Sequence, residues 1–294
     1  MSAEVLPHDW SLWCETKPTV IQPLDGGLTN KNFLLAAGDK HYVLRINSPI
    51  SEALNLDRAT EAQVLRLADK AGLCAPLVYC DPGYQYLVTG HLAGDVWSAD
   101  TVDGVSQLAQ LLRRVHQLPP VDTKLDVARK AEHYWHSIHS FDANGFLSEL
   151  KELDNRVTKH LKAAMSASQG ICLCHNDLLK DNLIVTDADK LIAIDWEYAA
   201  MGDPFYDLAV IVEGHDFSSQ QQRVLLSKYL GRDVNVEDWQ RLYHWRIIYR
   251  YLTVLWYVVQ YSTGAMSGLS VQENIIEQIQ SLFELIAKGA ESEI

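Results

Sequence analysis

The strongest structural signal in this chain is CHNDLLKDNLIVTDADKLIAIDWEY, residues 174–198. Two short apolar runs within it, 183–185 and 191–194, are separated by a polar turn. Such runs around a turn predict a β-hairpin. Because a hairpin puts the start of its first strand beside the end of its second, we expect Asn182 and Asp195 to be neighbours, although thirteen residues separate them.

The polar residues at this end of the hairpin have the chemistry of a metal-dependent transfer site. Asn182 and Asp195 offer oxygen atoms that suit Mg²⁺, a hard cation that takes few protein ligands and leaves places for phosphate. Asp177, five residues before Asn182, is then free to accept a proton. The arrangement resembles the catalytic loop and metal-binding Asp of protein-kinase-like phosphotransferases. The alternative is a surface hairpin with acidic turn residues, which the complete pattern disfavours.

Length and composition are those of an ordinary globular protein. At 294 residues, the chain can form one large domain or two lobes around a sizeable core. Hydrophobic residues make up 48% of it and charged residues 21%, which is usual for such proteins. No run of about 18 apolar residues is present to span a membrane, and the first residues lack a basic and then apolar signal segment. We therefore expect a cytoplasmic protein that does not bind membranes.

Charge and cysteine content argue against several kinds of partner. The formal net charge of −13 argues against nucleic acid, whose phosphates require a basic surface, and is compatible with a cationic substrate. The five cysteines form no CxxC pair. Reduced thiols in the core are therefore expected, rather than disulfides or a zinc site.

The distribution of apolar residues predicts two lobes of different composition. Up to Gly90 the chain contains β-type runs around one helix, whereas helical spacing dominates afterwards. The predicted strands are 19–24, 33–37, 41–46, 77–80 and 84–89, and the predicted helices are 54–71, 105–115, 146–166, 219–230, 237–261 and 271–288. This pattern indicates an α+β, bilobal fold: a small β-rich N-lobe over residues 1–90, and a larger, mostly helical C-lobe over 91–294 that contains the hairpin.

A glycine-rich loop in the N-lobe suits a nucleotide. Gly26 and Gly27 lie between two predicted strands, and because they have no Cβ atoms the backbone there can approach a phosphate closely. Thr29, Asn30 and Asn32 follow with hydroxyl and amide donors. The alternative, a simple turn, is common for a Gly-Gly pair between strands.

Arg45 is a charged residue inside the apolar run 42–46. An unpaired charge in that position would be costly, so a partner is expected, and Glu61 on the following helix is the natural one. The alternative is an exposed strand residue and a solvated helix glutamate.

Four segments together resemble the choline/ethanolamine kinase family, which belongs to the aminoglycoside-phosphotransferase branch of protein-kinase-like folds. They are GGLTNKN (26–32), VLR (43–45), CHND (174–177) and IDWEY (194–198). Choline kinases commonly carry Arg rather than Lys on the third strand, as at Arg45. The segment IDWEYA also resembles bacterial thiamine kinases, and GDPFYDL (202–208) resembles the segment after the metal-binding Asp in bacterial members.

The resemblance implies roles for the residues of the catalytic loop and the hairpin. Asp177 would orient the acceptor hydroxyl and accept its proton, while Asn182 and Asp195 would hold Mg²⁺ against the nucleotide phosphates. His175 would hold the catalytic loop rather than act as a base. Asp207 would brace the same loop by accepting hydrogen bonds from its backbone.

The resemblance also implies how ATP would bind in the N-lobe. Arg45, positioned by Glu61, would contact the nucleotide phosphates. The remaining nucleotide-binding residues would be Gly26, Gly27, Thr29, Asn30 and Asn32 over the phosphates, with the backbone of Gly90 and Leu92 at the adenine edge.

The acceptor pocket is the least constrained part of the prediction. Trp245, Tyr249, Leu252 and Trp256 fall at helical spacing on one stripe, most of which is expected to be core. The resemblance implies that Trp256 would line the pocket for a cationic headgroup, and that the negative charge of a nearby Glu197 would attract this headgroup. Tyr198 and Tyr206 are further candidates for this pocket. Thr253 stands where the family has a second Trp, which leaves room for a flatter, larger cation.

Several functions remain open from the sequence. Phosphorylation of a small cationic alcohol is favoured, with choline first, thiamine second, and ethanolamine or an aminoglycoside less favoured. A non-catalytic nucleotide-binding protein or scaffold is the alternative of another class. It is disfavoured because a protein that only binds has no use for the proton acceptor Asp177.

Overall fold

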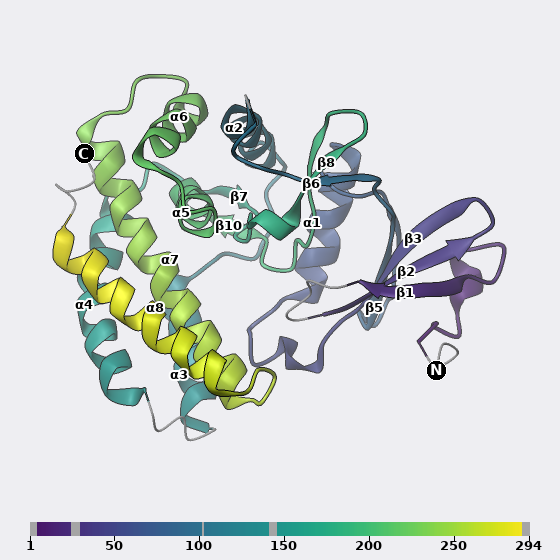
Figure 1. Cartoon of the computed structure of the whole chain (residues 1–294), viewed down its shortest axis with the longest axis horizontal. Helices are drawn as coiled ribbons and strands as arrows, with labels where there is room; N and C mark the ends of the chain where they lie inside the picture. The colour runs from purple at the N-terminus through teal and green to yellow at the C-terminus, as the bar shows by residue number, and fades with distance from the viewer. Residues whose placement is uncertain (1–4, 25–29, 102, 141–145, 290–294) are drawn as a thin grey trace.

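The computed structural model describes residues 5–24, 30–101, 103–140 and 146–289, and has the two lobes expected from the sequence (Figure 1). The N-lobe contains an antiparallel sheet with the strand order β1-β2-β3-β5-β4. Its elements are β1 (Thr19–Leu24), β2 (Lys31–Ala37), β3 (Lys40–Ile46), β4 (Leu77–Cys80), β5 (Tyr86–Gly90) and α1 (Arg58–Lys70). Short 3₁₀ turns lie at Trp10–Leu12, Pro49–Ser51 and Lys180–Asn182.

Apolar side chains on one face of the N-lobe sheet form a small core of their own. Leu35 on β2 and Leu44 on β3 are buried there with Tyr86 and Val88 on β5. All five predicted strands are confirmed. The last begins later than residue 84, because Tyr84 has a left-handed φ of +55° in the preceding turn, and an extended strand excludes that conformation.

Helix α1 begins at Arg58, so its predicted start at residue 54 was wrong. Asp57 is the N-cap and accepts hydrogen bonds from the backbone nitrogens of Ala59 and Thr60 at 3.1 and 3.0 Å. A capping residue has non-helical backbone, so the helix cannot extend before it. Leu54 is fully buried but reaches the core from a turn, which is why it had matched the helical pattern.

The predicted hairpin is present in the C-lobe. The C-lobe strands are β6 (Gly94–Val96), β7 (Cys172–Cys174), β8 (Leu183–Thr186), β9 (Leu191–Ala193) and β10 (Ala200–Gly202). Leu183 of β8 pairs with Ala193 of β9, and β6 pairs with the other edge of β8. The N–H of Ile194 donates to the carbonyl oxygen of Asn182 at 2.9 Å. Asn182 therefore lies beside Asp195, as expected.

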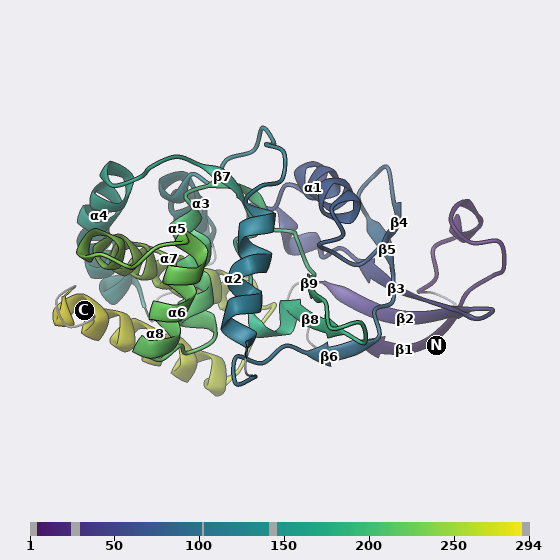
Figure 2. The ribbon, with the colours of Figure 1, turned by 90° about the horizontal axis from the view of Figure 1, so that it is seen from above.

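Helix α7 is the centre of the helical lobe. The C-lobe helices are α2 (Gly104–Val115), α3 (Val127–Ser140), α4 (Leu147–Ser166), α5 (Pro204–Gly214), α6 (Ser219–Leu230), α7 (Val236–Ser262) and α8 (Leu269–Lys288). α7 packs against α3, α4, α5 and α8, while α2 packs against α6 nearer the N-lobe (Figure 2). In the parts of the chain that the structure describes, no helix is long and apolar enough to cross a membrane.

Two of these helices, α3 and α5, were missing from the sequence prediction. Every residue of α5 from 205 to 212 is buried, so no polar face marks the helical period. The buried residues of α3 are Val127, Ala131, Tyr134 and Ile138. Their spacing is helical, but Ala131 and Tyr134 mark an apolar face only weakly.

The two lobes are joined through α1 as well as through the chain. Val64 and Leu65 on α1 belong to the same hydrophobic cluster as the C-lobe helices. Strand β5 ends at Gly90 and β6 already pairs with the C-lobe hairpin. We propose that the lobes divide between these two strands.

Candidate active site

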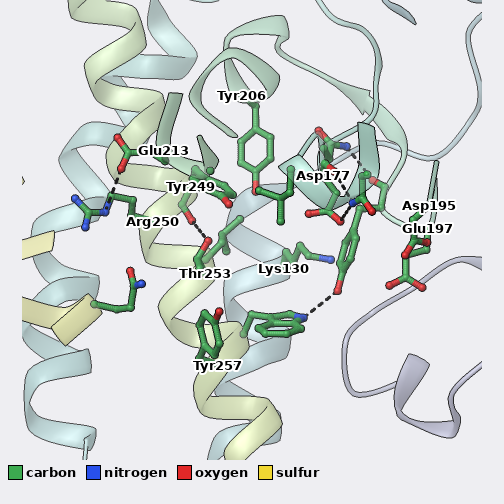
Figure 3. A pocket seen from close by; sticks show the side chains of 18 of the residues that line it. Lys130, Asp177, Asp195, Glu197, Tyr206, Glu213, Tyr249, Arg250, Thr253 and Tyr257 are labelled. Carbon is green, nitrogen blue, oxygen red and sulfur yellow. Dashed lines mark hydrogen bonds and ion pairs between the residues drawn. The ribbon is translucent and has the colours of Figure 1, made fainter. Parts of the chain in front are cut away.

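A cavity of about 420 Å³ lies where the catalytic loop, the hairpin end and helices α3, α5 and α7 meet (Figure 3). The predicted site residues that line it are Asp177, Asn182, Asp195, Glu197, Tyr198, Tyr206 and Trp256. Lining residues that the sequence analysis did not assign to the site include Lys130, Tyr134, Asp181, Tyr249, Arg250 and Tyr257. The fold thus brings the acidic residues and one aromatic wall to a single cavity.

Asp177 and Asn182 are joined within the catalytic loop. The Nδ2 atom of Asn182 donates to the backbone oxygen of Asp177 at 2.8 Å and to its Oδ2 atom at 2.9 Å. Burial raises the pKa of Asp177 well above its ordinary value, and the carboxylates of Asp195 and Glu197 raise it further. When ionised, Asp177 is therefore a stronger base than a solvated aspartate.

The oxygen atoms at the hairpin end suit a hard divalent cation. The Asp195 side chain is 28% exposed, and its Oδ1 atom accepts a hydrogen bond from Nη1 of Arg45 at 2.8 Å. Burial raises the pKa of Asp195 to about 7, and Glu197 adds to this effect while Arg45 opposes it. Because Nδ2 of Asn182 donates to Asp177, the side-chain oxygen Oδ1 of Asn182 remains to bind a cation. Clustered carboxylates with raised pKa values fit a Mg²⁺ ion held by Asn182 and Asp195.

Arg45 forms the predicted ion pair with Glu61 and also bonds to Asp195. Both members of the predicted pair are buried. Burial opposes the charge of Arg45, but Glu61 and then Asp195 outweigh it and raise the pKa of the guanidinium. This pairing connects β3 and α1 of the N-lobe to the hairpin end of the C-lobe.

Arg58, which the sequence analysis did not single out, extends this network to Glu197. Its Nη1 atom donates to Oε2 of Glu61 at 2.9 Å and to Oε2 of Glu197 at 2.8 Å. The Asn30 side chain donates to Glu197 at 2.6 Å and accepts from Arg58 at 3.0 Å. Glu197 is thus buried against an N-lobe cation that lies 139 residues away in sequence, and no local motif marks this contact.

Asp207 braces the backbone of the catalytic loop. Its Oδ2 atom accepts from the backbone nitrogen of His175 at 2.9 Å, and its Oδ1 atom accepts from that of Asn176 at 2.6 Å. Asn176 has a left-handed φ of +65°, so the chain turns directly after these two N–H groups. Asp207 is fully buried, so these bonds are shielded from water.

His175 lies beneath the loop rather than in the cavity. Its Nε2 atom lies 3.1 Å from the carbonyl oxygen of Ile194, and its ring packs against Trp196 with centroids 4.5 Å apart. Burial lowers the pKa of His175 to about 4, although Asp207 opposes this. The imidazole is therefore neutral and can donate to Ile194, which suits a supporting role.

Lys130 places a cation among the aromatic residues of the cavity. Its Nζ atom lies 5.3 Å from the ring centroid of Tyr134 and 5.1 Å from that of Tyr198. Burial lowers the pKa of Lys130 to about 8, and Glu197 opposes this shift. Trp256 donates from Nε1 to the hydroxyl of Tyr198 at 2.9 Å, so the indole and the phenol form one wall. Lys130 lies on α3, a helix that was not predicted because its apolar pattern is weak.

The remaining predicted nucleotide-binding residues lie away from this cavity or outside the described residues. Gly26, Gly27 and Thr29 lie outside the described residues. Asn32 is on β2, in register with Arg45. The N–H of Gly90 donates to the carbonyl oxygen of Pro76 at 2.8 Å, and Leu92 follows between β5 and β6. Their roles stay predictions.

Comparison with known proteins places the chain in a family. The profile of the phosphotransferase enzyme family matches residues 20–245. The protein LicA of Haemophilus influenzae is 28% identical over 251 residues, which cover 79% of this chain and 70% of that protein. The thiamine kinase of Escherichia coli is 28% identical over 235 residues, or 76% of this chain and 77% of that protein.

Solved structures show the same fold. The crystal structure of the choline kinase LicA from Streptococcus pneumoniae has a TM-score of 0.77 at 22% identity, and the match covers 92% of this chain and 95% of that one. Together with the profile match over most of the chain, the fold and the clustered acidic residues lead to one conclusion: the chain belongs to the phosphotransferase enzyme family and is a kinase.

Proposed function

We propose that the protein transfers the γ-phosphoryl group of ATP to the hydroxyl of a small cationic alcohol, with choline as the first candidate. The observation that carries this proposal is the meeting of Asp177, Asn182 and Asp195 in a cavity that Trp256 and Tyr257 also line. The acidic end suits phosphoryl transfer, and the aromatic wall suits a quaternary ammonium group.

The proposed chemistry assigns a task to each group at the acidic end. Asp177 positions the acceptor hydroxyl and takes its proton as the bond to phosphorus forms. Asn182 and Asp195 hold Mg²⁺, which when bound neutralises charge on the nucleotide phosphates. Arg45 is held by Glu61 and faces the same phosphates. The nucleotide would be covered by Gly26, Gly27, Thr29, Asn30 and Asn32, and its adenine edge would meet the backbone of Gly90 and Leu92.

The structure favours a particular place for the acceptor cation. Glu197, which the sequence analysis assigned to the cation, is paired with Arg58, and Lys130 already lies beside Tyr198 and Tyr134. A substrate cation between these two tyrosines would meet the positive charge of Lys130. We therefore propose that the cation binds farther along the wall, against Trp256.

Lys130 should accordingly weaken the binding of a cationic acceptor in a pH-dependent way. Because its pKa is lowered to about 8, Lys130 loses its charge as the pH rises through that value. The KM for choline, whose own charge does not titrate, should fall between about pH 7 and pH 9. Lys130→Met should have this lower KM for choline at every pH in the range, roughly tenfold below the wild-type value at pH 7.

Steady-state kinetics at saturating Mg·ATP would measure this effect. Lys151→Met, which removes an exposed lysine on α4, is the matched control and should keep the wild-type pH profile. An unchanged KM in Lys130→Met would mean that the acceptor cation does not approach Lys130.

Thiamine is the second candidate acceptor. The similarity to a thiamine kinase over 76% of the chain and the small side chain of Thr253 in the cavity lining both favour it. A planar ring system needs more width than a trimethylammonium group, and Thr253 leaves that width beside Trp256.

A substrate panel would test the proposal. ADP release from Mg·ATP should be measured with choline, ethanolamine, thiamine and an aminoglycoside, with GTP as an alternative donor. The expected result is the highest kcat/KM for choline. A higher kcat/KM for thiamine would make thiamine the preferred acceptor. Turnover of the aminoglycoside alone would overturn the assignment to small cationic alcohols.

A further inference from the structure

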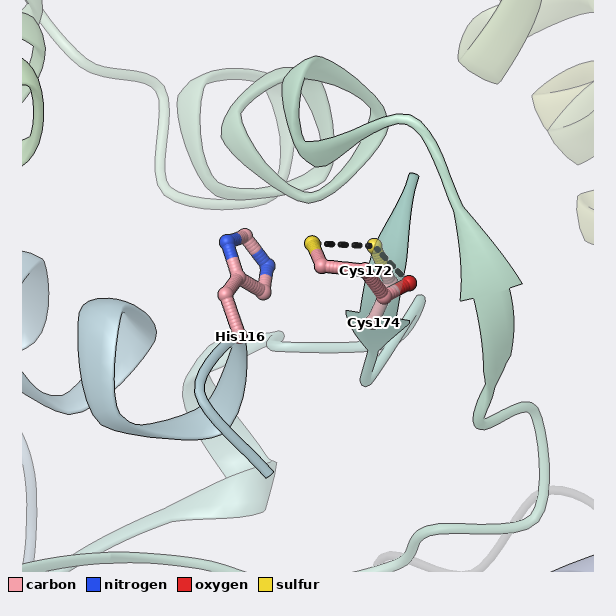
Figure 4. Close-up of side chains that lie close together, drawn as sticks. All are labelled: His116, Cys172 and Cys174. Carbon is pink, nitrogen blue, oxygen red and sulfur yellow. Dashed lines mark hydrogen bonds between the residues drawn. The ribbon is translucent and has the colours of Figure 1, made fainter. Parts of the chain in front are cut away.

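A cluster of three metal-binding side chains lies behind the catalytic loop, outside the cavity described above (Figure 4). Cys172 and Cys174 are two residues apart on strand β7, so their side chains leave the same face of the strand. His116 reaches them from the C-terminal end of α2. One ligand atom from each of the three residues lies within 4.8 Å of the other two. We propose that Cys172, Cys174 and His116 bind a soft divalent cation such as Zn²⁺.

The spacing of the two sulfur atoms matches tetrahedral coordination. In the structure, the Sγ atoms of Cys172 and Cys174 are 3.8 Å apart. A Zn–S distance of about 2.3 Å and a tetrahedral angle of about 109° put two ligating sulfur atoms about 3.8 Å apart. The strand therefore already holds the two sulfur atoms at the separation that a bound ion requires.

The surroundings of His116 suit a metal-binding imidazole. Nδ1 is hydrogen-bonded to the hydroxyl of Tyr229 at 2.8 Å, and Nε2 lies 3.0 Å from Oδ2 of Asp207. The Tyr229 hydroxyl can accept a hydrogen bond from Nδ1–H, which leaves Nε2 as the ligand atom once the ion replaces its contact with Asp207. The negative charge of Asp207 beside the cluster favours a dication.

The thiols are in surroundings that allow deprotonation. A hydrogen bond from Cys174 lowers the pKa of Cys172; burial opposes this shift and His116 supports it. Cys174 is fully buried and burial raises its pKa, so an ion must displace its proton on binding. Reduced thiols and no zinc site were expected from the sequence because the cysteines form no CxxC pair; the C-x-C pair on β7 and His116 lie far apart in the chain, so no local motif marks their meeting.

Cd²⁺ is a suitable probe, since thiolate ligation of this ion produces an ultraviolet charge-transfer band. The full-length protein, freed of metals and kept reduced, should be titrated with Cd²⁺ and then with Zn²⁺ as competitor. We expect one equivalent of Cd²⁺ to bind with a thiolate band that Zn²⁺ abolishes. Cys172→Ser and Cys174→Ser should each weaken Cd²⁺ binding at least about tenfold. Cys80 is a half-buried thiol on β4, and the control variant Cys80→Ser should bind Cd²⁺ as the wild type does.

The ¹¹³Cd chemical shift of the wild-type complex provides a measurement that needs no variant. Two sulfur ligands and one nitrogen ligand are expected. The absence of a thiolate band, its persistence in the Cys172→Ser/Cys174→Ser double variant, or a shift typical of oxygen ligands alone would overturn the proposal. These readouts do not depend on kinase activity, so they are independent of the proposed function.

Discussion

Replacing Asp177 with Asn should lower kcat by roughly 10²- to 10⁴-fold while Mg·ATP still binds. The substitution keeps the size of the side chain and an oxygen that can accept from Asn182, but it removes the group that takes the proton of the acceptor. Burial and the neighbouring carboxylates make Asp177 a strong base, and the other carboxylate of the cavity with a raised pKa, Asp195, is assigned to the metal. Single-turnover kinetics and a separate nucleotide titration would measure the two quantities.

Asp181→Asn is the matched control for this experiment. Asp181 lines the same cavity, is exposed to solvent and lies four residues further along the same loop. The Asp181→Asn variant therefore removes one negative charge from the same region without changing the proposed base. Equal losses in the two variants would mean that charge in the cavity, rather than proton transfer to Asp177, controls the rate.

Asp207→Asn should cost about 3 kcal/mol or more in the free energy of unfolding. Asp207 accepts from the backbone nitrogens of His175 and Asn176 and lies 3.0 Å from the ring of His116. An asparagine has one acceptor oxygen, so at least one buried N–H group loses its partner. Urea denaturation followed by circular dichroism would measure the loss.

The pH dependence of stability gives a second readout of the same carboxylate. In the metal-free protein, burial opposes the charge of His116, but the hydrogen bond and the charge of Asp207 outweigh it and raise the pKa of His116 to about 9. A histidine with a raised pKa stabilises the folded state fully below its ordinary pKa of about 6.5, and this contribution is lost as the pH rises through about 9. Asp207→Asn should flatten the stability profile in that range.

Asp57→Asn is the control, because Asp57 is an exposed aspartate that also accepts backbone hydrogen bonds. Asp57 caps α1 through Ala59 and Thr60, and asparagine caps helices about as well as aspartate. A change below about 1 kcal/mol is expected there. A similarly small effect of Asp207→Asn would contradict the bracing role.

Local pattern was sufficient for the hairpin and for the residues at its end. The two apolar runs pair across the turn at residues 186–190, and that pairing brings Asn182 to Asp195. The Arg45–Glu61 pair was also predictable, because a charge inside an apolar strand needs a partner nearby in the chain. Helix α5, by contrast, is buried all round and carries no periodic signal.

The contacts that the local patterns did not predict arise only when distant segments pack together. Arg58 neutralises Glu197 across 139 residues, Lys130 enters the aromatic wall from a helix with a weak pattern, and His116 meets Cys172 and Cys174 from the end of another helix. In each case the chemistry depends on side chains that lie within a few ångströms of one another. The order of residues determines which side chains share a face of a helix or strand. The distances between side chains of different segments, in contrast, follow from how the lobes and helices pack against one another.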